Sequence, residues 1–312
     1  MHGDRDAALV RLGWALRDAG YVFVTVSPET HRRVEFRAAA SGKRVARSLR
    51  DVFGWSRPFE GRLLPPQVLA LATAAGVIEN EAALLRSTVR FSSLGGLLFV
   101  HSAYPTSGVD SVFFGPDTYR YCDLVMAEVQ RARRVVDVGC GSGAGGIVAA
   151  LNAERVVLCD VNREALAFAR VNATLAGQEQ RVELVESDVL LGVEGAIDVV
   201  IANPPYMVDP ARRSYRDGGG AFGEGLGARI AREALERLDP GGRLVLYTGS
   251  AVVDGVDTFL EAIRGPCDRS CQTWHYREID PDVFGEEIEQ NDAYARVERI
   301  AAVALVATRR KT

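Results

Sequence analysis

The segment from Val135 to Gly146, with the sequence VVDVGCGSGAGG, decides the fold of this 312-residue chain. Apolar residues precede Asp137, and five glycines stand within the eight positions 139–146. Such a run predicts a buried strand that ends in a turn and continues as a helix. Glycine costs conformational entropy, so this density is typical of a loop whose bare backbone lies against a ligand. Free N–H groups at the start of the following helix favour a ligand there as well.

Two classes of cofactor fit such a loop. Gly141, Gly143 and Gly146 match the dinucleotide-binding fingerprint, and Asp160 follows about 20 residues later, as that fingerprint requires. The carboxylate of Asp137, however, is expected at the strand end, where it would repel a nucleotide pyrophosphate and attract an ammonium or sulfonium group. The residues therefore favour a cationic cofactor over NAD and a nicotinamide oxidoreductase.

A second motif, Asn203-Pro204-Pro205-Tyr206, follows another apolar segment about 60 residues after the glycines and has no role in hydride transfer. With the glycine-rich loop, it resembles the Asn-Pro-Pro-Tyr branch of the class I S-adenosylmethionine-dependent methyltransferases. That branch includes adenine-N6 methyltransferases of DNA and RNA and HemK-type protein-glutamine methyltransferases. The resemblance covers residues 112–308. It implies an α/β fold with a Rossmann-like seven-stranded sheet, and S-adenosyl-L-methionine as the cofactor.

The elements expected after the glycine-rich loop alternate as in a parallel sheet with helices on both faces. Helices are expected at residues 163–176 and 228–238. The expected strands are residues 155–159, 181–185, 196–202, 243–247, 272–277 and 299–307. The resemblance implies that the last two strands form an antiparallel hairpin.

Ligands of an open α/β sheet bind beyond the carboxyl ends of its strands, and the candidate cofactor residues follow such ends. Asp160 offers a carboxylate to ribose hydroxyls. The resemblance implies that Asp188 bonds the adenine amine of the cofactor and that Phe114, Asp117 or Thr118 contacts its methionine end. The expected cofactor site comprises Thr118, Asp137, Gly139, Cys140, Gly141, Gly143, Asp160, Val161, Asp188, Val189 and Asn203.

The expected catalytic residues are Asn203, Pro204 and Tyr206. The Asn203 side-chain oxygen and the Pro204 carbonyl accept both N–H hydrogens of a planar amine or amide, which orients its nitrogen for methyl transfer. Tyr206 offers a face on which a planar base or amide stacks. Pro205 completes this loop as a substrate-binding residue.

A glycine-rich stretch, residues 215–220, follows that motif, and the family carries a similar element that closes over the substrate. We therefore expect Tyr215, Arg216 and Gly218 to bind substrate. With Arg216, the neighbouring Arg212 and Arg213 add positive charge that suits a phosphate-bearing substrate. The alternative is a solvated loop without ligand contacts.

The charge is unevenly distributed between two expected domains, residues 1–105 for substrate recognition and 106–312 for methyl transfer. Residues 1–130 have a net charge of +2, and the remainder has −6. Residues 32–50 hold seven cations (Arg32, Arg33, Arg37, Lys43, Arg44, Arg47 and Arg50) and only Glu35 as an acid. This stretch is either a solvated surface or a binding surface for a polyanion such as RNA.

The N-terminal domain is expected to be a small α+β unit with a winged-helix-like arrangement. Helices are expected at residues 6–19, 65–75 and 79–85, with a short strand at 21–26. Strands 88–94 and 97–101 flank Gly95-Gly96, which predicts a hairpin.

The favoured substrate is an adenine amine in structured RNA (tRNA or rRNA). The alternative substrates are a protein glutamine and a small molecule. The alternative to an enzyme is a binding protein that has lost activity. No apolar run reaches the ~20 residues that span a membrane, and Met1 to Asp6 lack a signal-peptide core. We therefore expect a cytoplasmic protein without membrane contacts. Five cysteines suit a reducing compartment, and no metal site is expected.

Overall fold

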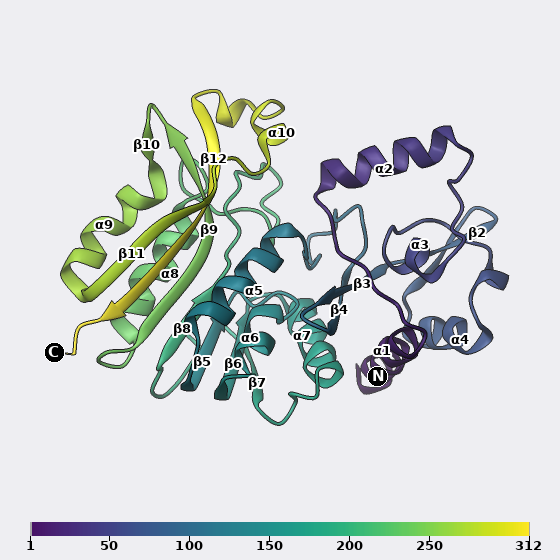
Figure 1. Cartoon of the computed structure of the whole chain (residues 1–312), viewed down its shortest axis with the longest axis horizontal. Helices are drawn as coiled ribbons and strands as arrows, with labels where there is room; N and C mark the ends of the chain where they lie inside the picture. Colours follow the sequence, from purple (N-terminus) through teal and green to yellow (C-terminus); the bar gives the residue numbers. More distant parts are fainter. Residues whose placement is uncertain (1, 312) are drawn as a thin grey trace.

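A mixed β-sheet forms the centre of the computed structural model, which describes residues 2–311 (Figure 1). Its strand order is β11-β12-β9-β8-β5-β6-β7, and the short β10 (Val256–Asp257) pairs with β9. The five strands β5 to β9 run parallel where they pair, whereas β11 and β12 are antiparallel to their neighbours. The strands are β5 (Ala132–Val138), β6 (Ala153–Asp160), β7 (Val182–Glu186), β8 (Val199–Ala202), β9 (Arg243–Val253), β11 (Cys271–Asp280) and β12 (Val297–Arg309). The Rossmann-like sheet and its final hairpin are confirmed.

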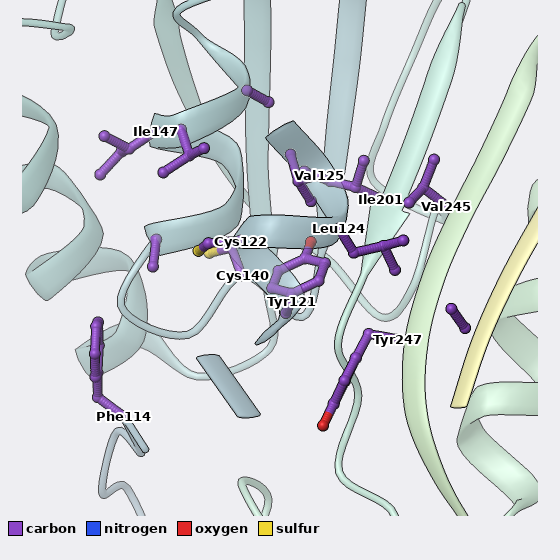
Figure 2. Close-up of a cluster of buried hydrophobic side chains, with 14 of the residues drawn as sticks. Phe114, Tyr121, Cys122, Leu124, Val125, Cys140, Ile147, Ile201, Val245 and Tyr247 are labelled. Carbon is purple, nitrogen blue, oxygen red and sulfur yellow. The ribbon is translucent and has the colours of Figure 1, made fainter. Parts of the chain in front are cut away.

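Two layers of helices cover this sheet because alternate strand residues point to opposite faces. Val135 of β5 belongs to the core cluster under α5 (Pro116–Glu128), α6 (Ala144–Ala149) and α7 (Arg163–Leu175). Val136 belongs to the cluster under α8 (Gly225–Arg237) and α9 (Thr258–Ser270). The first cluster includes Leu124 and Val125 of α5 together with Ile201 of β8 (Figure 2).

The register of the sheet brings the ends of its central strands together. Val138 of β5 lies opposite Cys159 of β6 on one side and Ala202 of β8 on the other. Asp160 is in turn paired with Glu186, the last residue of β7. The segments that follow these four strands, which carry most of the expected site residues, therefore meet at one edge of the sheet.

The N-terminal region (residues 2–105) consists of helices followed by two hairpins (Figure 1). Gly95 and Gly96 form the expected turn between β3 and β4, both with positive φ. The likeness of the N-terminal region to a winged helix stays a prediction. The elements are α1 (His2–Asp18), α2 (Pro28–Ala40), α3 (Leu49–Phe53), η1 (Gly61–Leu63), α4 (Pro66–Ala74), β1 (Ile78–Glu81), β2 (Leu84–Ser87), β3 (Val89–Leu94) and β4 (Leu97–Ser102).

The segment expected as a helix at residues 79–85 is instead the hairpin β1–β2. Ala82 turns the chain with φ 54°. Leu85 pairs with Phe59 through two backbone hydrogen bonds of 2.8 Å, and Phe59 is fully buried. These tertiary contacts outweigh the helix propensity of the Ala, Leu and Glu residues in the segment. The expected strand at 21–26 forms no regular strand.

The N-terminal region packs on α7. Its hydrophobic core includes Ala165, Phe168 and Val171 from that helix. The buried Asn172 side chain bonds the N–H and carbonyl of Val100 in β4 at 2.7 and 2.9 Å, and it donates to the Ser142 carbonyl at 2.8 Å. One α7 residue therefore joins the second hairpin to the glycine-rich loop.

Within residues 2–311, no helix combines the length and the apolar character needed to cross a membrane. The connection between β11 and β12 holds the short helices α10 (Gly285–Ile288) and η2 (Asp292–Tyr294), and Phe284 of this connection lines the site described next.

Candidate active site

A pocket of ≈ 230 Å³ lies beyond the carboxyl ends of β5, β6 and β8. It is lined by the glycine-rich loop, the start of α5, the residues after β6 and β7, and the Asn-Pro-Pro-Tyr motif. The N-terminal region contributes Pro28, the first residue of α2, and the β11–β12 connection contributes Phe284. The two motifs singled out in the sequence therefore face the same space.

The glycine-rich loop presents bare backbone to this pocket. Gly139 and Gly141 have φ values of 66° and 53°, and a Cβ at either position would meet only open space. Cys140, Ser142 and Gly145 line the pocket as well. Gly143 does not line it, in contrast to our expectation. Its φ is 79°, and a Cβ there would lie 3.0 Å from Leu158, so close packing and backbone conformation both require this glycine.

Asp137 does not line the pocket either, which corrects the expectation that its charge meets the cofactor. The strand pleat turns its side chain toward α5 and α6, where Tyr121 donates to it at 2.7 Å and the Gly146 N–H at 2.7 Å. Burial raises its pKa to about 7, although both hydrogen bonds oppose this shift. Asp137 therefore fixes the turn that shapes the loop.

Asp160 supports the loop from the next strand. Its carboxylate accepts hydrogen bonds from the Gly141 N–H at 2.9 Å and the Asn162 N–H at 2.8 Å. Burial raises the pKa of this carboxyl group, against the effect of those bonds. Each carboxylate oxygen keeps a lone pair for a further donor. Asp160 and the half-exposed Val161 line the pocket, as expected for contacts with ribose and adenine.

Asp188 and Val189 line the pocket from the end of β7. Val189 is buried and has φ 52°, an uncommon backbone conformation for a β-branched residue. Arg229 of α8 holds the Asp188 carboxylate through two hydrogen bonds of 2.8 and 2.9 Å. The sequence pattern did not indicate this ion pair, which fixes the carboxylate that is expected to accept from the adenine amine.

The start of α5 lies at the other end of the pocket. Thr118 accepts a hydrogen bond from the Gly115 N–H at 3.2 Å and lines the pocket beside Asp117. Phe114 lies in the core, stacked on His101 with ring centroids 4.9 Å apart, and Phe113 lines the pocket in its place. Of the three candidates for the methionine end, Asp117 and Thr118 are therefore positioned for contact.

Asn203 and Pro204 line the pocket, and neither the Asn203 side chain nor the Pro204 carbonyl has a hydrogen-bond partner among residues 2–311. Both oxygens therefore have no competing partner within these residues, and their role as acceptors for a substrate stays a prediction. Pro205 lines the pocket next to them.

Contacts within the protein hold the Tyr206 side chain in place, so its ring is not simply a free surface for stacking. Its hydroxyl donates to the buried Asp117 carboxylate, and a Cβ on Gly249 would collide with its ring. Asp117 also accepts from the Tyr247 hydroxyl at 2.6 Å and from Arg120 at 3.3 Å. Burial and the nearby carboxylate raise the pKa of Tyr206 well above its usual value, so the hydroxyl stays a donor.

The loop after this motif is tied down on both sides, in contrast to a solvated loop. Tyr215 donates to the Thr106 carbonyl at 2.7 Å, and Arg216 pairs with Glu287 of α10 at 2.5 Å. Tyr215 and Arg216 line the pocket as expected. Arg213 is paired with Asp209 at 2.6 Å. The positive charges expected from Arg213 and Arg216 are therefore neutralised within the protein.

Gly218 lies behind the Asn-Pro-Pro-Tyr motif and does not line the pocket, in contrast to our expectation. A Cβ there would come within 2.7 Å of the Tyr206 Cα and 2.8 Å of the Pro205 carbonyl oxygen. Its small size lets the two backbone segments pack together. It therefore supports the motif and does not contact a substrate from this position.

Sequence reasoning missed Phe284, Asn172 and Arg229. Phe284 lines the pocket with φ 58°, a strained conformation for an aromatic residue, and its ring centroid lies 6.2 Å from that of Tyr206. No local pattern marks it, because it reaches the pocket from the distant β11–β12 connection. A polar residue at an otherwise apolar position of α7 was the only signal for Asn172.

The pocket fits S-adenosylmethionine. The open glycine positions admit a ligand against the backbone, and Asp160 and Asp188 offer carboxylates to its ribose and adenine. Val161 and Val189 offer apolar contacts for the adenine ring.

Comparisons with known proteins agree with this geometry. The family described as "Methyltransferase small domain" matches residues 122–277, half of the chain. The release factor glutamine methyltransferase of Deinococcus radiodurans is 36% identical over 155 residues, covering 45% of this chain and 55% of that protein. The tRNA1(Val) (adenine(37)-N6)-methyltransferase of Aeromonas hydrophila is 31% identical over 137 residues, covering 42% and 57%. The chain thus matches about half the length of these curated relatives.

Among solved structures, Methanocaldococcus jannaschii Trm5 in complex with adenosine has a TM-score of 0.51 at 20% identity, covering 72% of this chain and 57% of that one. This likeness supports the fold. The family match confirms the resemblance inferred from the two motifs. The chain therefore belongs to the methyltransferase small domain family, in the Asn-Pro-Pro-Tyr branch of the class I S-adenosylmethionine-dependent methyltransferases.

Proposed function

We propose that this protein transfers a methyl group from S-adenosylmethionine to a planar amino or amide nitrogen. One observation carries the proposal: Asn203 and Pro204 line the same pocket as the open glycines, and neither the Asn203 amide nor the Pro204 carbonyl has a partner among residues 2–311. Two acceptors on adjacent residues match a group that carries two N–H hydrogens.

The protein's own residues orient the acceptor nitrogen. S-adenosylmethionine, when bound, supplies a methyl group on a positively charged sulfonium. Asn203 and Pro204 accept the two N–H hydrogens and so aim the nitrogen lone pair, which is otherwise delocalised into the neighbouring π-system. The same oxygens stabilise the positive charge that grows on nitrogen during transfer. The reaction needs no strong general base, because the nitrogen becomes acidic only as it is methylated.

The substrate that we favour is an adenine amine in structured RNA. The basic stretch 32–50 follows Pro28, which lines the catalytic pocket, so a polyanion bound along this stretch can extend to the site. The Aeromonas hydrophila relative is named for an adenine in tRNA. The five cysteines are free thiols, which suits the reducing cytoplasm as the place of the reaction.

A protein glutamine is the second candidate. Several relatives are named release factor glutamine methyltransferases, and a glutamine amide also carries two N–H hydrogens on a planar nitrogen. The acceptor geometry of Asn203 and Pro204 suits both groups. The substrate must therefore be distinguished by experiment.

The test measures how much labelled methyl this protein transfers from S-adenosylmethionine into separated RNA, DNA, protein and metabolite fractions. The fractions come from a cell that lacks the gene. We expect label in RNA that nuclease treatment removes. Label in protein would instead establish the glutamine candidate. Absence of transfer to every fraction would contradict the proposed activity.

The Asn203→Ala variant tests the mechanism. Loss of one acceptor of this kind lowers kcat by about 100-fold or more, while binding of S-adenosylmethionine should stay near normal by calorimetry. The matched control is Asn152→Ala, which removes an amide that bonds the Val129 carbonyl at 2.9 Å, away from the pocket. Full activity in Asn203→Ala would disprove the proposed role of this side chain.

A further inference from the structure

The helix α2 and the connection that follows it form an exposed basic surface beside the catalytic pocket. Pro28, its first residue, lines that pocket, and the helix extends from there across the N-terminal region (Figure 1). With 13 residues, α2 is about 20 Å long at 1.5 Å per residue. We call residues 28–47 the basic arm.

Ion pairs within the protein neutralise only part of the basic arm. Arg32 and Arg33 share the single carboxylate of Glu29, each at 2.7 Å. Four further cations are exposed and have no side-chain hydrogen bond or ion pair with any residue in 2–311: Arg37, Lys43, Arg44 and Arg47. All four lie in the last turn of α2 or in its connection to α3. The unneutralised charge is therefore concentrated at the end of the arm away from the pocket.

An aromatic side chain stands among these cations. Phe36 is 72% exposed, although Phe is usually a core residue. It lies one turn after Arg32 and Arg33 and immediately before Arg37, on the solvent side of α2. An exposed aromatic ring flanked by cations is the combination with which proteins bind single-stranded nucleic acid, since the ring stacks on a base and the cations contact phosphates.

The arm is fixed firmly to the rest of the molecule at its pocket end. The Thr25 N–H, just before α2, donates to the Tyr119 hydroxyl of α5 at 3.0 Å. Within the helix, the buried His31 accepts a hydrogen bond from the buried Arg90 of β3 at 3.3 Å. The centroid of its ring lies 4.0 Å from the ring centroid of Tyr104. Because Tyr119 follows the pocket-lining Thr118, the orientation of the arm is set relative to the pocket itself.

We propose that the basic arm binds a single-stranded segment of the RNA substrate, with a base stacked on Phe36 and phosphates on Arg37, Lys43, Arg44 and Arg47. The segment lies along α2 and leads toward Pro28, where the target nucleotide enters the pocket. A single strand is required, because the bases of a duplex are stacked on one another and present no free face to Phe36. This inference rests on the proposed function in taking RNA as the substrate.

Binding of a labelled single-stranded RNA oligonucleotide of mixed sequence to the full chain, measured by fluorescence anisotropy, tests the arm. Phe36→Ala should weaken binding by about tenfold, the scale for one lost base–aromatic stack. It should leave binding of inorganic polyphosphate unchanged, since polyphosphate has no bases. The matched control is Leu151→Ala, which removes an apolar side chain that is 57% exposed, in the turn between α6 and β6.

The charge contribution is tested by salt dependence. Replacement of Arg37, Lys43, Arg44 and Arg47 by Gln should lower the slope of log K against log salt by about 0.7 for each lost phosphate contact. The control replaces two exposed cations of α9, Arg264 and Arg269, by Gln. Failure of the wild-type protein to bind the oligonucleotide, or equal binding by wild type and arm variants, would disprove the role of the arm.

The failure of this inference and that of the proposed function are distinguishable. RNA that is methylated equally well by wild type and arm variants would disprove the arm and keep the activity. RNA that binds through the arm but receives no methyl group would support the arm and contradict RNA as the methyl acceptor.

Discussion

Tyr206 is held by more contacts than its place in the motif required. Its hydroxyl donates to Asp117, its ring packs against Gly249, and Asp117 is itself held by Tyr247 and Arg120. Because Asp117 lies at the start of α5 beside Thr118, these contacts join the expected cofactor end of the pocket to the expected acceptor end. We therefore expect Asp117 to act as a positioning residue for Tyr206.

A double-mutant cycle of Tyr206→Phe and Asp117→Asn tests this coupling. Tyr206→Phe keeps the ring but frees it to move, so kcat should fall and the KM for the acceptor should rise, with the Kd for S-adenosylmethionine unchanged. Both groups act through one hydrogen bond, so the cycle should give a coupling energy of about 1–3 kcal/mol. Strictly additive effects would show that Asp117 acts elsewhere, and Tyr247→Phe serves as the control for its second hydroxyl partner.

Helix α2 carries His31, a buried histidine that is uncharged in the folded protein. Burial, and then the nearby Arg90, lower the pKa of His31 to about 3. A histidine whose pKa is depressed in the folded state stabilises the fold above its unfolded pKa of about 6.5, and this contribution is lost as the pH falls toward 3. His101, which is fully buried beside Ser92, has a pKa shifted in the same direction by burial.

We therefore expect the unfolding free energy of the His31→Gln variant to depend less on pH below 6.5 than that of the wild type. Between pH 6.5 and 4, the wild type should lose up to about 1.4 kcal/mol of unfolding free energy per pH unit relative to the variant. Urea unfolding at a series of pH values measures the difference. The exposed His275→Gln serves as the control, and parallel profiles for wild type and His31→Gln would contradict the expectation.

The elements also show where local sequence is insufficient. The hairpin β3–β4 was predictable because two glycines form its turn, and only a few residue types adopt the positive φ values required there. The hairpin β1–β2 was not, because its Ala, Leu and Glu residues favour a helix in isolation. Its pairing depends on Phe59, a residue from a preceding segment that only the folded chain places beside Leu85.

At the scale of the whole molecule, the N-terminal region and the sheet domain share a hydrophobic core. Phe168 of α7 is buried among side chains of the N-terminal region, and Arg5 of α1 lies over its ring at 5.8 Å. Arg170 of α7 pairs with Asp6 of α1 at 3.1 Å. A shared core predicts that the two parts unfold in one transition, although we expect them to have separate functions.

Phe168→Ala should therefore destabilise the whole chain by about 3–5 kcal/mol, as expected for a buried Phe replaced by Ala. Calorimetry should show one transition at a lower temperature. Phe36→Ala removes the same number of atoms from an exposed position and should leave the melting temperature unchanged. Two separate transitions, with only one of them shifted by Phe168→Ala, would contradict a shared core.

The sequence by itself determined the sheet, the glycine-rich loop and the Asn-Pro-Pro-Tyr motif. These depend on short-range patterns: apolar strands, positive-φ glycines such as Gly139 and Gly141, and prolines that fix φ. Only the tertiary structure decided which charged side chains pair with one another and which aromatic side chains reach the pocket. The pleat turns Asp137 away from the pocket, Arg213 and Arg216 meet carboxylates, and Phe284 arrives from a distant connection. Such pairings join residues far apart or on different faces, so they arise only when the chain is packed.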